Sequence, residues 1–157
     1  MAASTLKIEP QSALGILWCR RCGAIHHNKR WRIQDLVALP PNPPFAAHET
    51  LCPGCERVEN GFYSGELILE GKTTNLTLDA VKELVAEVED KCWRDNPASR
   101  VCSVTEDKTG RIQILTTTEW LAIRISKEIQ KVHNGELDTE WSKTDQFVTI
   151  RWYRPRK

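Results

Sequence analysis

The sequence predicts an α+β protein: an amino-terminal zinc ribbon followed by a ferredoxin-like βαββαβ domain with two helices on an antiparallel sheet. Two observations carry this prediction. Two Cys-x-x-Cys pairs lie in the amino-terminal part, and strand and helix patterns alternate from residue 64 onward. A chain of 157 residues suits a metal-held module plus one small domain. We therefore expect a mobile leader at 1–12, a zinc-ribbon module at 13–63, and an α+β domain with a basic tail at 64–157.

The cysteine pairs have the spacing of a closed metal site. Two thiolates separated by two residues bind one side of a tetrahedral ion, and a second such pair completes four-coordination. We call the two pairs, Cys19–Cys22 and Cys52–Cys55, the first and second clip. Gly23 follows the first clip and Pro53-Gly54 lies inside the second, and these residues allow the chain to turn around a metal ion. The sequence thus predicts one structural zinc ion, with four thiolate ligands: Cys19, Cys22, Cys52 and Cys55.

Other interpretations of these cysteines remain open. Disulfides are disfavoured because no apolar signal segment precedes the first pair, which indicates a cytoplasmic protein with reduced thiols. Iron is a closer alternative, since rubredoxins use two similar clips, but those electron carriers are acidic and the interval after Cys22 is basic. A histidine among His26, His27 and His48 is a further alternative ligand.

From residue 64 onward, patterns typical of strands and helices follow one another along the sequence. Residues 66–70 alternate as a short strand, and Thr77 is a plausible N-cap for a helix that ends before Pro97. That helix has an apolar stripe at three- and four-residue steps: Leu78, Val81, Val85, Val88 and Cys92. Two further strands, 101–105 and 111–116, flank a turn sequence and predict a hairpin.

A second helix and one or two strands complete the pattern. Thr117 or Thr118 is expected to cap this helix, and Asn134-Gly135 to end it in the left-handed region. Its apolar stripe comprises Leu121, Ile125, Ile129 and Val132. Residues 137–141 and 147–153 follow as strand candidates, so the order is βαββαβ with one extra terminal hairpin.

The residue pattern does not indicate an enzyme. Four thiolates leave a metal no open position, and neither a nucleophile motif nor a phosphate-binding glycine loop is found in the sequence. Cys92 and Cys102 are expected as buried small apolar residues, with a redox pair as the alternative. No segment approaches the length of a membrane span, so we expect a soluble cytoplasmic protein.

Basic residues interleaved with aromatic ones give the main functional signal. Lysine and arginine contact phosphates, and exposed aromatic rings stack on unpaired bases. The candidate nucleic-acid-binding residues are Arg20, Arg21, Lys29, Arg30, Trp31, Arg32, Arg154 and Arg156. The alternative is a solvated loop and tail, with Trp31 and Trp152 in the core. The strand at 110–115 lacks the paired aromatics of an RNA recognition motif, so base reading is not assigned to that sheet.

Several stretches together resemble a known family: Cys19–Ala24, Cys52–Cys55, the three threonines 116–118 with the helix after them, and 134–137. The chain resembles small bacterial zinc-ribbon proteins related to the amino-terminal region of the nuclear export adapter of the large ribosomal subunit. This resemblance implies a zinc-bearing module that docks on the large subunit, and we expect the partner to be ribosomal RNA or the large subunit. The adapter's further domains and export signal have no counterpart in the sequence, so export is not implied. The alternative is a zinc-stabilised protein–protein adaptor.

Overall fold

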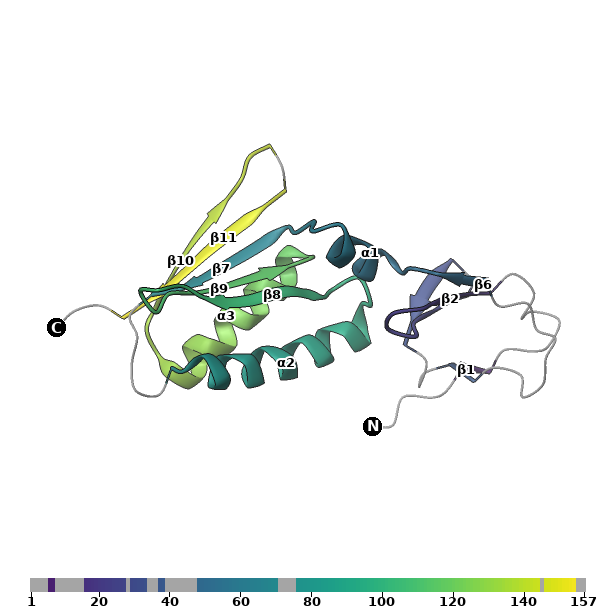
Figure 1. The fold of residues 1–157 in the computed structure, drawn as a ribbon, viewed down its shortest axis with the longest axis horizontal. Helices are drawn as coiled ribbons and strands as arrows, with labels where there is room; N and C mark the ends of the chain where they lie inside the picture. Colours follow the sequence, from purple (N-terminus) through teal and green to yellow (C-terminus); the bar gives the residue numbers. More distant parts are fainter. Residues whose placement is uncertain are drawn as a thin grey trace.

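The computed structural model describes residues 6–7, 16–27, 29–33, 37–38, 48–70, 76–144 and 146–154. Within them, a small sheet lies at one end of the molecule and a larger sheet with two long helices at the other (Figure 1). A short helix, α1 (Pro53–Glu59), lies between the two sheets. The proline-rich stretch at residues 40–44 lies outside the described residues. In the described part of the chain, no helix is both long and apolar enough to cross a membrane.

The small sheet presents the first cysteine pair. Its four strands run in the order β4-β3-β2-β6, with β2 and β6 parallel and the other pairs antiparallel. The strands are β2 (Leu17–Cys19), β3 (Ile25–His27), β4 (Arg30–Arg32) and β6 (His48–Thr50). A separate two-residue ladder joins β1 (Leu6–Lys7) in parallel to β5 (Val37–Ala38). Part of the expected leader therefore pairs with the segment that follows β4.

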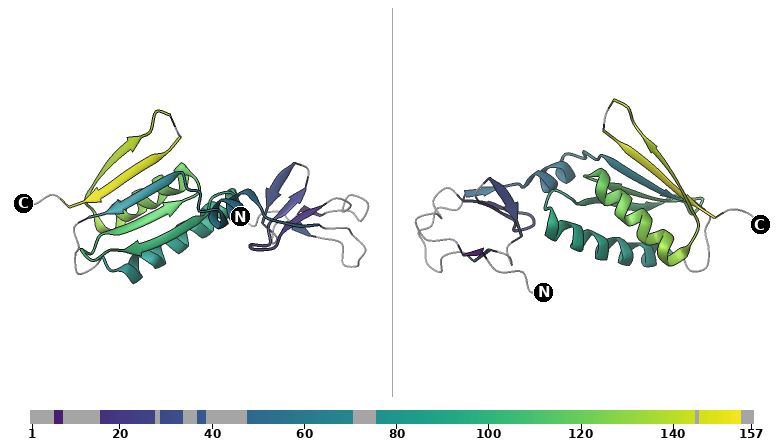
Figure 2. Two further views of the ribbon diagram at one scale, coloured as in Figure 1. Left: turned by 45° about the horizontal axis from the view of Figure 1, so that its top comes forward. Right: turned by 180° about the vertical axis from the view of Figure 1, so that it is seen from behind.

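The large sheet has five strands in the order β10-β11-β7-β9-β8. Helices α2 (Leu78–Asp95) and α3 (Glu119–His133) both cover the same face of it (Figure 2). The strands are β7 (Gly65–Leu69), β8 (Val101–Glu106), β9 (Ile112–Thr116), β10 (Glu136–Trp141) and β11 (Val148–Tyr153). The order of strands and helices along the chain is thus the expected one, including the extra terminal hairpin, but the ferredoxin-like arrangement of the sheet is not confirmed.

The prediction of a wholly antiparallel sheet is wrong at one pair, because β7 and β11 are parallel. Strand β10 takes the direction expected after α3 but lies at the sheet edge, and β11 turns back to lie between it and β7. The difference in burial between β10 and β11 explains their positions in the sheet. Strand β11 buries Val148, Ile150 and Trp152 completely, whereas β10 has mostly exposed residues. The more apolar strand therefore takes the inner position.

The helices begin and pack as their sequences predict, with one exception. Thr77 caps α2 and Thr118 caps α3, each with its hydroxyl accepting a backbone N–H of the first turn. Their apolar stripes meet the sheet in one core of leucine, isoleucine and valine side chains. Val132 was expected in this stripe but is 56 % exposed, since it lies in the last turn of α3, after the final buried residue, Ile129.

Candidate metal centre

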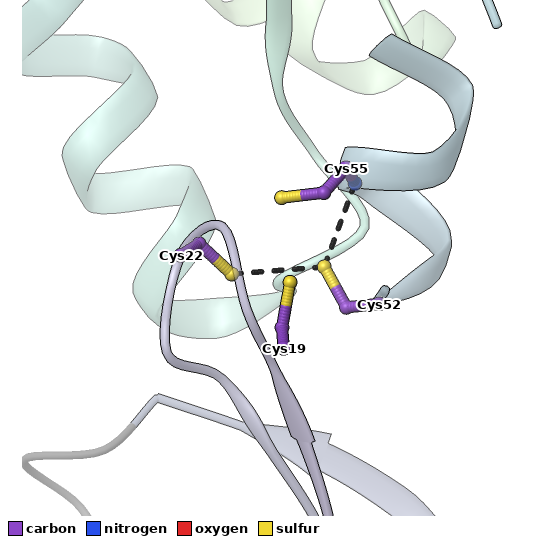
Figure 3. A group of neighbouring side chains, drawn as sticks. All are labelled: Cys19, Cys22, Cys52 and Cys55. Atoms are coloured by element: carbon purple, nitrogen blue, oxygen red, sulfur yellow. Dashed lines mark hydrogen bonds between the residues drawn. The ribbon is translucent and has the colours of Figure 1, made fainter. Parts of the chain in front are cut away.

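Four thiols converge where the small sheet meets α1. Cys19 ends β2 and Cys22 lies in the turn after it, while Cys52 is the N-cap of α1 and Cys55 lies in its first turn. Their side chains point toward one another from these two segments (Figure 3). Segments thirty residues apart in the chain thus supply two sulfurs each. The sequence prediction that these four residues form one cluster is confirmed.

The sulfur geometry fits a tetrahedral metal ion. All four Sγ atoms lie within 4.8 Å of one another, and the Sγ atoms of Cys22 and Cys52 are 3.7 Å apart. A tetrahedral ion with bonds of about 2.3 Å to sulfur separates its ligands by roughly 3.8 Å. Three of the thiols are buried and Cys22 is half-buried, so few water molecules can reach the centre. The cluster can therefore hold a metal ion as a closed, structural site.

Backbone hydrogen bonds fix both clips in shape. The Cys19 N–H donates to the carbonyl oxygen of Ala24 at 2.8 Å, and the Gly23 N–H donates to Cys19 O at 2.9 Å. Gly23 has a φ of 80°, a conformation that a side chain would strain. In the second clip the Cys55 N–H points at the sulfur of Cys52, 3.5 Å away. An amide aimed at a sulfur favours the thiolate form that a metal requires.

Without a metal, the four thiols cannot all carry charge. Contact with Cys52 lowers the pKa of the more exposed Cys22 to about 5, so this sulfur holds the negative charge. The same contact, together with burial, raises the pKa of Cys52, and burial raises that of Cys55 to about 12. At neutral pH Cys52 and Cys55 are therefore protonated in the metal-free fold. A divalent cation offsets the charge of all four thiolates.

We accordingly expect metal binding to release protons. Zinc added to the reduced, metal-free protein at neutral pH should displace thiol protons. A free cysteine with a pKa of about 8.5 is protonated at this pH, and where the cluster forms before the ion binds, the raised pKa values of Cys52 and Cys55 keep these two thiols protonated. Zinc affinity should then rise with pH through the neutral range. Proton release measured with a pH indicator during zinc titration tests this. A pH-independent affinity without proton release would contradict it.

The metal clip is also attached to the large domain. The guanidinium of Arg57, on α1, donates to the carbonyl oxygen of Thr117 at 2.8 Å. Gly54 lies against the loop between α2 and β8, where an added Cβ would come within 2.6 Å of Pro97 O and 2.9 Å of Ala98 O. The metal centre is therefore positioned at the junction, with one clip in the small sheet and the other on a helix packed against the large domain.

Replacing Gly54 with alanine should weaken this junction. A Cβ at this position collides with backbone oxygens that cannot move aside, so we expect a loss of about 1–3 kcal/mol of stability. Zinc stoichiometry should stay unchanged, because no thiol is removed. Chemical unfolding of the zinc-loaded protein measures the loss, with the exposed neighbour change Pro53→Ala as the control. Equal stability of Gly54→Ala and Pro53→Ala would contradict the packing described.

The candidate nucleic-acid-binding residues do not lie together. Arg20 and Arg21 are exposed in the first clip, and Arg20 lies 3.6 Å from the carboxylate of Glu59. Lys29 and Arg30 are exposed at the turn between β3 and β4. Arg154 follows β11 of the large sheet, whereas these four residues belong to the small sheet and its turns, and the two sheets lie at opposite ends of the molecule (Figure 1). Arg156 is outside the described residues. The first-module cations therefore lie at the two ends of β3, with Arg20 and Arg21 in the turn before it and Lys29 and Arg30 at the turn after it.

Three of the predicted nucleic-acid-binding residues are partly buried or contact other parts of the chain. Trp31 is half-buried, packs against the cysteine cluster and lies 5.2 Å from the ring of His26. Arg32 is half-buried, with one terminal nitrogen, Nη1, completely enclosed. Arg154 donates to the carbonyl oxygen of His133 at 2.7 Å. These contacts favour packing over base stacking as the role of Trp31.

The remaining cysteines lie outside the cluster. Cys92 is buried in the large core, as expected, and the half-buried Cys102 places its thiol 3.6 Å from Phe62 O. Burial raises the pKa of both thiols, which keeps them protonated. The cluster of thiols within reach of one ion includes no histidine among the residues described.

Sequence reasoning missed the junction. It assigned no helix after the second clip, whereas helix α1 begins within the clip itself. Two features of the sequence indicate this helix: Pro53 at its first position and Glu56 in its first turn. The surface of the large domain that α1 contacts, around Pro97 and Thr117, cannot be recognised from the sequence near α1.

Comparison with known proteins adds no relationship: no protein-family model matches the chain, and no curated protein matches it either.

Proposed function

We propose that this protein is a zinc-containing RNA- or ribonucleoprotein-binding protein that docks on the large ribosomal subunit. Zinc is the ion that suits four converging thiolates with no open coordination position. In that case the ion supplies no chemistry of its own and fixes the small sheet against α1. The binding surface would then be the rigid, basic module built around it.

The charge distribution of the small sheet carries the RNA-binding proposal. Between residues 16 and 33 the sequence has no carboxylate, and its cations are Arg20, Arg21, Lys29, Arg30 and Arg32. Lys29 and Arg30 are exposed at a hairpin end, where side chains can reach a phosphate backbone without displacing other elements. A zinc-fixed hairpin presents these charges on a rigid support, which reduces the entropy lost on binding.

Docking on the large subunit rests on the resemblance of the cysteine clips and the threonine–helix segment to the ribosomal export adapter family. The proposed role is in subunit assembly, quality control or translation regulation. Such a role needs binding rather than catalysis, in keeping with a closed metal centre. Co-sedimentation with purified large subunits, followed by crosslink mapping, tests it directly.

Removing two exposed cations should reduce the salt dependence of RNA binding. For single-stranded RNA the slope of log affinity against log salt is about −0.7 per neutralised phosphate. The double change Lys29→Ala and Arg30→Ala should therefore flatten that slope by about 1 to 1.5. Affinity for a short single-stranded RNA, measured by fluorescence anisotropy over a range of salt concentrations, gives the slope.

A matched pair of cations elsewhere provides the control. Lys82, on α2, and Lys108, in the β8–β9 turn, are both exposed, and their change to alanine should leave the slope unaltered. Binding of RNA and of large subunits by the Lys29/Arg30 variant at wild-type strength would exclude this surface as the docking face.

The second candidate function is a zinc-stabilised adaptor that binds protein and no nucleic acid. One observation favours it: among the described residues, strand β10 ends the large sheet without a neighbour on its outer side. Such an edge is a common docking point for extended polypeptides.

A further inference from the structure

Strand β10 is a regular sheet edge open to pairing. All six of its residues are in register with β11, and within the described chain no strand lies beyond it. Five of those six residues are exposed. The β10–β11 hairpin extends away from the helices at its turn end (Figure 1). An edge of this length offers enough backbone groups for a further strand.

The hydrogen-bonding pattern shows which backbone groups face outward. The Ser142 N–H donates to Phe147 O at 2.8 Å, so these two residues form a hydrogen-bonded pair at the end of the ladder. Hydrogen-bonded pairs alternate along an antiparallel ladder, and Glu140, Asp138 and Glu136 therefore direct their backbone groups toward β11. Leu137, Thr139 and Trp141 direct their N–H and C=O groups away from the sheet.

The opposite edge of the sheet is less suited to pairing. Strand β8 contains an irregularity between Val101 and Ser103, where the register shifts. The Val101 N–H is already bonded to a carboxylate oxygen of Glu89, and the Cys102 thiol donates to Phe62 O. Irregular edges with occupied donors resist strand addition. Of the two edges of the large sheet, β10 is therefore better suited to pair with a further strand.

Side-chain charge indicates the chemistry of that partner. The sheet face away from the helices carries Glu136, Asp138 and Glu140 at alternate positions of β10, and all three are exposed. A second copy of the chain paired through β10 would bring acids opposite acids on this face, which is unfavourable. Lysine or arginine at alternate positions of a new strand would instead meet them as opposite charges. On the other face, Trp141 is 52 % exposed and offers an apolar contact.

We propose that β10 binds an extended, lysine- or arginine-bearing segment of another protein as a sixth strand of the large sheet. The outward backbone groups of Leu137, Thr139 and Trp141 form the ladder. The acids at 136, 138 and 140 select basic side chains, and Trp141 packs against the apolar residue between them. This interface goes beyond the proposed RNA binding and lies at a different part of the molecule from Lys29 and Arg30.

A synthetic peptide of sequence Lys-Val-Lys-Val-Lys-Val, labelled for fluorescence anisotropy, tests the interface in the zinc-loaded full chain without RNA. Thr139→Pro removes an outward N–H from an exposed edge position that tolerates proline. It should weaken binding by about tenfold, the effect of one or two hydrogen bonds. Thr139→Val keeps that N–H and should bind as the wild type does. Amide hydrogen exchange should show new protection along β10 when the lysine peptide is present.

Charge selection is tested separately from backbone pairing. Asp138→Lys, at an exposed position, should weaken binding of the lysine peptide and strengthen binding of Glu-Val-Glu-Val-Glu-Val, an effect that salt reduces. If Thr139→Pro fails to fold, the Asp138→Lys variant still tests whether the peptide binds at β10. Three results would overturn the proposal: no binding of the lysine peptide, equal binding by the Thr139 variants, or a wild-type dimer that Thr139→Pro disrupts.

Discussion

Removal of the metal is expected to unfold the small sheet while the large domain stays folded. The two clips join β2 and its turn to α1, and the cysteines pack with Ala24, Trp31 and Leu51. The other buried apolar side chains described in this module are only Ile16, Ile25 and Ile33. So small an apolar core cannot offset the chain entropy of its strands. In zinc-binding peptides the metal contributes on the order of 10 kcal/mol to folding, and here we expect an effect of the same size.

Limited proteolysis with and without a chelator measures this effect. Residues 16–50 should become sensitive to cleavage when zinc is removed or when Cys52 is changed to serine, and the segment from residue 64 onward should remain protected. The loaded protein should contain one zinc ion per chain and be colourless. A red-brown product with little zinc would instead identify iron as the ion.

Cys102→Ser is the matched control for the loss of a thiol. Cys102 is half-buried but lies outside the metal cluster, and serine can keep a hydrogen bond to Phe62 O. We expect normal zinc content and normal protection of the small sheet in this variant. Chelation that leaves the cleavage pattern of the wild type unchanged would show that the small sheet does not depend on metal.

Trp152→Ala is expected to destabilise the large domain by about 3–5 kcal/mol, the usual cost of removing a buried tryptophan. The side chain is completely buried in β11, and its indole N–H donates to the carbonyl oxygen of Asn134. Gly135 lies against the indole ring, where a Cβ would meet the ring nitrogen at 2.5 Å. The change therefore opens a cavity and also leaves the turn after α3 without its partner.

Thermal unfolding of the zinc-loaded protein tests this prediction. For a domain of this size we expect the midpoint to fall by roughly 15–30 °C. Trp120→Ala is the control, because Trp120 is 71 % exposed at the start of α3 and its loss should shift the midpoint little. A similar shift in both variants would contradict a core role for Trp152.

The sequence alone determined the local elements and the four thiols. The helix cap at Thr77, the second cap at Thr117 or Thr118, the turn at Asn134-Gly135 and the alternation of β11 have local signals, because each depends on residues a few positions apart. The structure selects Thr118 as the second cap. The metal cluster was predictable for a related reason: the two-residue spacing within each clip is itself a constraint of tetrahedral ligation.

Only the tertiary structure decided the strand order of the large sheet and the position of the metal site, because both depend on contacts between distant segments. Both β10 and β11 follow α3, and their order in the sheet was settled by which strand gains more from burial against the helices; Trp152, Ile150 and Val148 gave β11 the inner place. The contact of Gly54 with Pro97 and Ala98 likewise joins segments more than forty residues apart. Long-range packing of this kind leaves no periodic pattern in either segment, and only the folded chain brings the metal clip to the junction and leaves β10 at the open edge.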